Sequence, residues 1–208
     1  MRSWSYEKVA ASCAFVLGAG GVGYALAFIA LLRHGGDAAA LTTGLFLFIG
    51  GLLTVAVLVA VYERVKQTDA AFALLALFLG AAGGIGSAMH GAEGVAALAN
   101  APSGGCVSGC ISPTDPRGLA TFGLLALSLA LISYLIARGA PLPRGLANLG
   151  FLAAALLLII YIGRVTIYDP TNKFLLFIAL LTGFIVNPLW YTWVGMSLWR
   201  GSTSTMRA

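Results

Sequence analysis

His90 and Glu93 are the residues whose types and spacing most directly suggest chemistry in this sequence. They lie three apart within residues 70–100, a long stretch that is otherwise almost uncharged and rich in small residues. In a helix, two residues at this spacing share a face and can contact each other. Ionisable side chains in such apolar surroundings are functional candidates by default, because the surroundings penalise their charge. The pair is therefore the first candidate for a polar site.

Other charged residues near the ends of apolar stretches could join this pair. Arg164 is the first candidate partner for Glu93, and Arg117 and Lys173 are further cations expected on the same side of a membrane. A partner of opposite charge lowers the cost of placing a carboxylate near hydrocarbon. The sequence thus predicts a polar cluster made of His90, Glu93 and Arg164, with His34 and Asp37 nearby.

Several kinds of chemistry are open to such a cluster. Two histidines and two carboxylates could hold Zn²⁺, but no H-E-x-x-H or similarly close spacing supports a metal site, so none is assigned. Haem could be held between His34 and His90 if the two face each other. A proton relay or solute site would use the cluster directly. Alternatively, His90 and Glu93 lie hydrated at the membrane interface and tie the third and fifth spans together. No cofactor is favoured.

Motifs for catalysis are absent from the sequence. It contains no G-x-S-x-G, P-loop or metalloprotease signature, and no lysine in an apolar stretch that could form a retinal Schiff base. Residues 18–23 read GAGGVG and match G-x-G-x-x-G, but no predicted strand precedes them, so we interpret them as a helix-packing segment. The sequence therefore leans away from an enzyme.

The composition identifies the solvent as a lipid bilayer. The chain has 208 residues, of which 60% are hydrophobic and only 9% are charged, against roughly 25% charged in soluble domains. We expect one all-α, six-helix integral membrane bundle over residues 1–208. The predicted spans are residues 9–32, 41–61, 70–98, 119–137, 146–163 and 174–198. The net charge of +5 comes from basic residues at the ends of these spans. That placement favours lipid headgroups over nucleic acid as the partner.

The distribution of basic residues predicts the orientation. Eight of the 12 Lys and Arg residues flank the termini and the even-numbered loops, and four lie on the other side. This bias predicts a bacterial inner-membrane protein with both termini in the cytoplasm and with the first span retained as a helix. The long loop 101–117 would then be external and oxidised, so Cys106 and Cys110 are predicted to form a disulfide.

Small residues predict how the spans pack. Two stripes are present at helical spacing: Gly80, Gly84, Ser87, Gly91 and Gly94 in the third span, and Gly18, Gly21 and Ala25 in the first. Such stripes let helix backbones approach closely inside a membrane. We therefore expect the first and third spans to touch, and expect remaining stripes to offer contacts for other membrane proteins.

The last span contains a helix break at Asn187-Pro188. Proline removes a backbone donor and frees a carbonyl, for which Asn187 could supply a partner. The break is either a hinge that lines a substrate path or a static kink, and the static kink is favoured because the first half of the chain has no matching break. The aromatic residues that follow are predicted to form a belt at the cytoplasmic interface: Trp190, Tyr191, Trp193 and Trp199.

The same span carries one resemblance to a known group. Residues 187–195 read NPLWYTWVG and residues 198–200 read LWR. This ending resembles the closing helix of a broad set of small bacterial membrane proteins that are grouped as a domain of unknown function. The resemblance implies a fold of about six helices and a bacterial membrane location, and no activity.

Three classes of function remain open from the sequence. The first is a non-enzymatic partner subunit or sensor. The second is a small transporter or proton-coupled permease with its site at His90, Glu93 and Arg164. The third is a membrane enzyme that binds haem, quinone or lipid at the same cluster.

Overall fold

The computed structural model describes residues 5–99, 116–167, 169 and 172–204, and nearly all of them are helical, with no strand in these ranges. The elements are α1 (Tyr6–His34), α2 (Asp37–Val65), α3 (Ala70–Ala99), α4 (Pro116–Ala137), α5 (Arg144–Thr166), α6 (Lys173–Leu181), the π-helical turn η1 (Thr182–Val186) and α7 (Asn187–Ser204). Six spans are long and apolar enough to cross a membrane, the sixth running through α6, η1 and α7. The predicted all-α, six-helix membrane bundle is confirmed.

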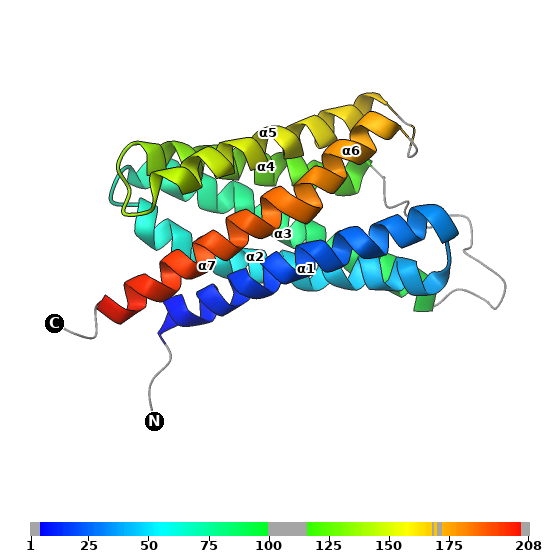
Figure 1. Ribbon diagram of the computed structural model, residues 1–208, viewed down its shortest axis with the longest axis horizontal. Helices are drawn as coiled ribbons and strands as arrows, with labels where there is room; N and C mark the ends of the chain where they lie inside the picture. The colour runs from blue at the N-terminus through cyan, green and yellow to red at the C-terminus, as the bar shows by residue number, and fades with distance from the viewer. Residues whose placement is uncertain (1–4, 100–115, 168, 170–171, 205–208) are drawn as a thin grey trace.

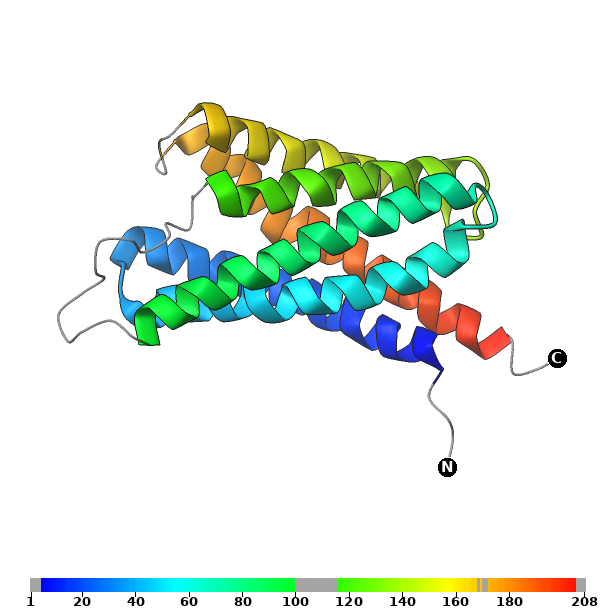
Figure 2. The same cartoon turned by 180° about the vertical axis from the view of Figure 1, so that it is seen from behind.

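The six spans form a closed ring in chain order (Figures 1 and 2). Each helix packs mainly against its neighbours in the chain, and α7 returns to pack against α1. Both termini lie at one end of the bundle, which we call the terminal end, together with the short α2–α3 and α4–α5 connections. The α1–α2 and α5–α6 connections lie at the opposite end. Side chains from all six spans line a space at the centre of the ring.

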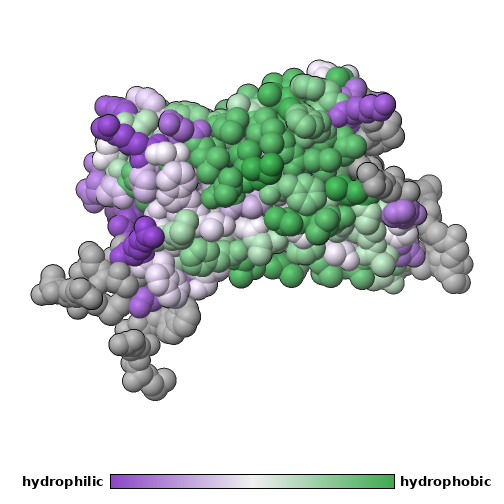
Figure 3. Space-filling model, in the orientation of Figure 1, coloured by the Kyte–Doolittle hydropathy of each residue, from purple (hydrophilic) through white to green (hydrophobic). Residues whose placement is uncertain are grey.

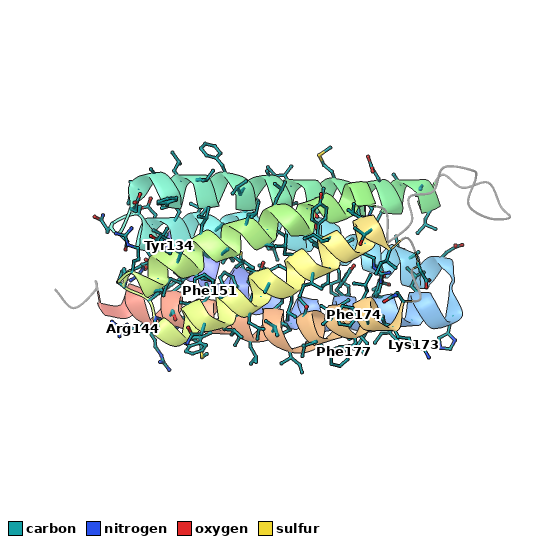
Figure 4. The ribbon with its side chains drawn as sticks, turned by 90° about the horizontal axis from the view of Figure 1, so that it is seen from above. Tyr134, Arg144, Phe151, Lys173, Phe174 and Phe177 are labelled. Carbon is teal, nitrogen blue, oxygen red and sulfur yellow. The ribbon has the colours of Figure 1, made fainter. Side chains whose placement is uncertain are left out.

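The outside of the ring is apolar over its middle. Figure 3 shows a band of hydrophobic residues between two ends that carry the hydrophilic ones. Figure 4 shows the same pattern along α5 and α6, where the exposed Phe151 and Phe177 lie between Arg144 at the terminal end and Lys173 at the opposite end. Aromatic and aliphatic side chains facing outward between basic ends are what a helix bundle in a bilayer requires.

Most helices extend beyond the apolar stretches that the sequence marks as spans. For example, α2 begins at Asp37 and ends at Val65, so it includes Arg64 at its end. Local signals explain such bounds. α1 ends at His34, and the two glycines that follow, Gly35 and Gly36, have φ values of 63° and 97° that suit glycine. The Asn172 side chain caps α6 by accepting a hydrogen bond from the Leu175 amide at 3.1 Å.

The glycine stripe of α3 packs against α2. A Cβ at Gly51 of α2 would meet the carbonyl oxygen of Gly84 and lie 2.7 Å from the Ala88 amide nitrogen, and Gly91 opposes Gly44 in the same way. The contact predicted between the first and third spans does not form an extended interface, because over the described residues α1 packs mainly against α2, η1 and α7. Small residues permit close approach, but the ring order decides which helix approaches.

The break in the last span takes the form of a π turn. The Asn187 amide donates to the carbonyl oxygen of Thr182, five residues back, immediately before Pro188. One extra residue in the turn accommodates the proline ring within a continuous helical span. α1 packs directly on this segment, where a Cβ at Gly18 would lie 3.2 Å from the Pro188 carbonyl oxygen. The break is thus placed at the contact that closes the ring.

The aromatic belt predicted for α7 is wrong in two members, Trp190 and Tyr191, which lie inside the bundle. Trp190 is only 2% exposed and packs edge-to-face on Tyr191, with ring centroids 5.1 Å apart, inside the bundle. Trp199, one turn from the end of the span, is exposed as an interfacial aromatic would be. A tryptophan faces protein or lipid according to the rotation of its helix, and composition alone does not determine that rotation.

Polar contacts at the terminal end join α1 to α2. Arg64 forms an ion pair with Glu7 at 2.8 Å, and the Tyr6 hydroxyl donates to the carbonyl oxygen of Ala56 at 2.9 Å. Just past α2, a hydrogen bond to the Glu63 carboxylate raises the pKa of Lys66. These charged groups lie where a bundle in a bilayer would meet water and headgroups.

Candidate functional site

A cavity of about 540 Å³ lies at the centre of the ring. All six spans contribute to its wall, and most of the lining side chains are apolar, such as Phe46, Leu157 and Leu180. The polar or ionisable lining residues are Tyr24, Thr42, Thr54, Ser87, Arg164, Thr182, Asn187 and Tyr191. The space is of the size that small ligands occupy in proteins, about 300–1,000 Å³.

Arg164 is the one described lining residue that carries a permanent charge. It lies in the last turn of α5, at the opposite end from the termini, and is 4% exposed. Its Nη1–H donates to the backbone oxygen of Asp169 at 2.7 Å. The helix dipole favours a cation at this terminus. A guanidinium carries five N–H donors, so most of its hydrogen-bonding capacity is not used by the described residues.

Tyr191 and Thr54 form the polar group nearer the terminal end. Their hydroxyl oxygens lie 3.2 Å apart, which joins α7 to α2, and the Thr54 hydroxyl also donates to the Gly50 carbonyl. Asn187 lines the cavity from the beginning of α7. The π turn lies immediately before Asn187, so it affects the rotation at which this residue faces the cavity. Hydrogen-bonding groups therefore occur at both ends of an otherwise apolar space.

A small pocket of about 60 Å³ continues from this second polar group toward Trp190. It shares Thr54, Asn187 and Tyr191 with the main cavity. Just behind it, a Cβ at Gly150 would meet Ser133 Oγ and lie 3.0 Å from Trp190 Nε1. Among the described residues, neither of these two buried donors has a hydrogen-bond partner. The absence of a side chain at Gly150 is what lets α4, α5 and α7 meet here.

The polar cluster predicted from the sequence is only partly assembled. Arg164 lies in the cavity wall, whereas Glu93 is exposed on α3, and α3 and α5 share no extended packing interface over the described residues. The expected Glu93–Arg164 ion pair is not among those that the described residues form. His90 is half-buried and makes a contact of its own, outside the cavity wall. The face of α3 that turns to the cavity carries Gly84 and Ser87 instead.

The remaining candidates lie apart from the cavity. His34 and Asp37 are both exposed, at the end of α1 and the beginning of α2. His34 and His90 therefore do not meet as a pair of haem ligands within the cavity. Among the described residues, no three His, Cys, Asp or Glu side chains come close enough to hold a metal ion. Cys106 and Cys110 lie outside the described residues, and Cys13 is a free thiol packed against the core.

One cavity residue carries a clear sequence signal. Asn187 is a polar residue beside a proline in the middle of an apolar span, a pattern that predicts a helix break. Thr54, Ser87 and Thr182 carry no comparable signal, because a lone hydroxyl in a membrane helix can bond its own backbone, as Thr182 does with Ile178 at 2.7 Å.

The described part of the wall carries hydroxyl, amide and guanidinium groups. No described residue in it is a histidine, cysteine, lysine or carboxylate. Comparison of the chain with protein-family models, with curated proteins and with solved structures gives no match.

Proposed function

We propose that this multi-pass membrane protein binds a small, mostly apolar molecule inside the bilayer and does not act as an enzyme. The observation that carries the proposal is the central cavity of about 540 Å³, walled by all six spans. Its apolar wall suits a hydrocarbon-like ligand, and its few hydroxyl and amide groups can orient one end of it.

A ligand bound in the cavity would contact the segment through which α7 packs on α1, so binding can affect the packing of the helices, as a sensor requires. Thr182 and Gly183 of the π turn line the cavity, and the same turn packs against α1. A Cβ at Gly183 would lie 3.2 Å from the Cβ of Ala25, so the two helices are already in close contact there. A ligand that presses on the turn would therefore act on the α1–α7 contact that closes the ring.

A photoreactive decyl alcohol, added to vesicles containing the protein, tests the proposal. We expect it to label cavity residues such as Leu157 and Leu180 in addition to lipid-facing residues such as Leu52. The substitution Gly20→Leu should reduce cavity labelling severalfold, because its Cβ is accommodated 3.8 Å from Phe46 and the rest of the side chain would occupy the cavity. Mass spectrometry of the labelled peptides gives the readout.

Gly94→Leu is the matched control, since a Cβ at Gly94 meets nothing within 4 Å and the residue lies off the cavity. It should leave labelling of Leu157 and Leu180 unchanged, and labelling of Leu52 should be the same in all three proteins. Labelling confined to lipid-facing positions in the wild type would reject the proposal.

For the location, we propose the bacterial inner membrane with both termini in the cytoplasm, on the basis of the eight-to-four bias of Lys and Arg. After reduction, a thiol reagent that cannot permeate membranes should then label Cys106 and Cys110 on intact cells. The double variant Cys106→Ser/Cys110→Ser should lose this labelling, since Cys13 lies within α1. Labelling seen only after the cells are broken would show the opposite orientation.

A further inference from the structure

We infer that the ligand of the central cavity is a single-chain amphiphile with an anionic head, and that Arg164 binds this head. The inference rests on the proposed function and specifies its ligand class. The starting observation is the position of the guanidinium, which lies in the cavity wall at 4% exposure, near the end of a membrane span.

A buried guanidinium requires compensation for the water that it gives up. The described residues supply Arg164 with one hydrogen bond, to the Asp169 backbone oxygen at 2.7 Å. The Asp169 carboxylate also acts electrostatically on Arg164, but the residue is exposed, and the two side chains do not form an ion pair within 4 Å. The remaining N–H donors suit the planar, two-oxygen edge of a carboxylate or phosphate.

The rest of the cavity determines that the anion carries a chain. From Arg164 toward the terminal end, the wall is made largely of apolar side chains, including Phe28, Phe46, Leu157 and Leu180. A free inorganic anion would leave this surface without contacts. An alkyl chain would fill it and would end near the Tyr191 and Thr54 hydroxyl groups.

The fold also provides a direction from which such a molecule can enter. α1 and α6 both line the cavity, yet they share no extended packing interface over the described residues, and Figure 1 shows them diverging beyond η1. A chain already dissolved in the bilayer could pass between them while its head stays near the membrane interface. This end of the bundle carries Arg164, so the head would reach the guanidinium while the chain lies against the apolar wall.

Three photoreactive decyl probes that differ only in the head group, an alcohol, a carboxylate and a phosphate monoester, test the inference in vesicles. Cavity labelling at Leu157 and Leu180, normalised to labelling at the lipid-facing Leu52, measures occupancy. We expect at least one of the two anionic probes to exceed the alcohol by about tenfold, as a charge-assisted hydrogen bond predicts. A preference for the carboxylate would indicate a fatty-acid-like ligand, and one for the phosphate a phospholipid-like ligand.

The variant Arg164→Gln should reduce cavity labelling by the anionic probes to the level of labelling by the alcohol. Arg164→Lys should retain part of the preference for anionic probes, because it keeps the positive charge but loses the planar guanidinium. Unchanged cavity labelling by the alcohol in Arg164→Gln shows that the variant is folded. If the alcohol labels the wild-type cavity and neither anion exceeds it, the anionic head is rejected while the proposed function stands. If no probe labels the cavity, the proposed function itself fails.

Discussion

Replacing Gly91 by alanine should destabilise the bundle by about 3 kcal/mol, at the upper end of the usual cost of overpacking a well-packed core. The added Cβ would meet the carbonyl oxygen of Gly44, would lie 2.5 Å from the Phe48 amide nitrogen and would lie 3.0 Å from the Leu47 Cβ. Two of these three neighbours are backbone atoms of α2, which cannot rotate away as a side chain can. The methyl group is therefore accommodated only if α2 and α3 separate, and close contact between these helices is what joins them in lipid.

Gly94→Ala provides the control on the same helix. Its added Cβ meets nothing within 4 Å, so the variant gains the helix propensity of alanine without the clash. The free energy of unfolding, measured for both variants in bicelles by steric trapping, should be lower for Gly91→Ala and unchanged or slightly higher for Gly94→Ala. Values for the two variants within about 0.5 kcal/mol of each other would contradict the α2–α3 packing described above.

Two features of the fold can be predicted from hydropathy summed along the chain. They are the number of spans and the placement of both termini at the same end. Apolar length predicts a membrane helix whatever its neighbours are. Because the number of spans is even, both termini lie on the same side of the bundle. The arrangement of the spans as a ring cannot be predicted in this way, because hydropathy does not specify which helix α7 packs against. The contact of Gly18 with the π turn next to Pro188 is a property of two distant segments together.

The candidate site was only partly predictable because its residues are brought together by helix rotation. Arg164 was identified from the sequence as a charged residue at a span end, and it does line the cavity. Glu93 was expected beside it, but α3 carries small residues on more than one face, and the face packed on α2 turns Glu93 outward. A cavity is a space left by six helices, so no local motif encodes it.

Trp190 shows most clearly how the rotation of a helix decides whether a residue faces protein or lipid. Removing its side chain is expected to have a large effect on stability. The indole is 2% exposed, packs against Tyr191 and lines the small pocket that continues the central cavity. In lipid, burying an apolar side chain brings little gain from leaving water, so the loss on truncation comes from the hole left behind and from lost dispersion contacts. We therefore expect Trp190→Ala to cost about 3 kcal/mol, the low end of the range for Phe or Trp to Ala in soluble cores.

Trp190→Phe should recover most of this loss, because it restores an aromatic ring and removes Nε1, a donor that has no partner among the described residues. Phe177→Ala serves as the control for deleting an aromatic side chain, since Phe177 is 62% exposed on the outside of α6. It should change the free energy of unfolding by no more than about 0.5 kcal/mol in the same bicelle measurement. An equal loss in Trp190→Ala and Phe177→Ala would mean that Trp190 faces lipid, as the sequence alone suggests, and that α7 is rotated relative to the arrangement in Figure 1.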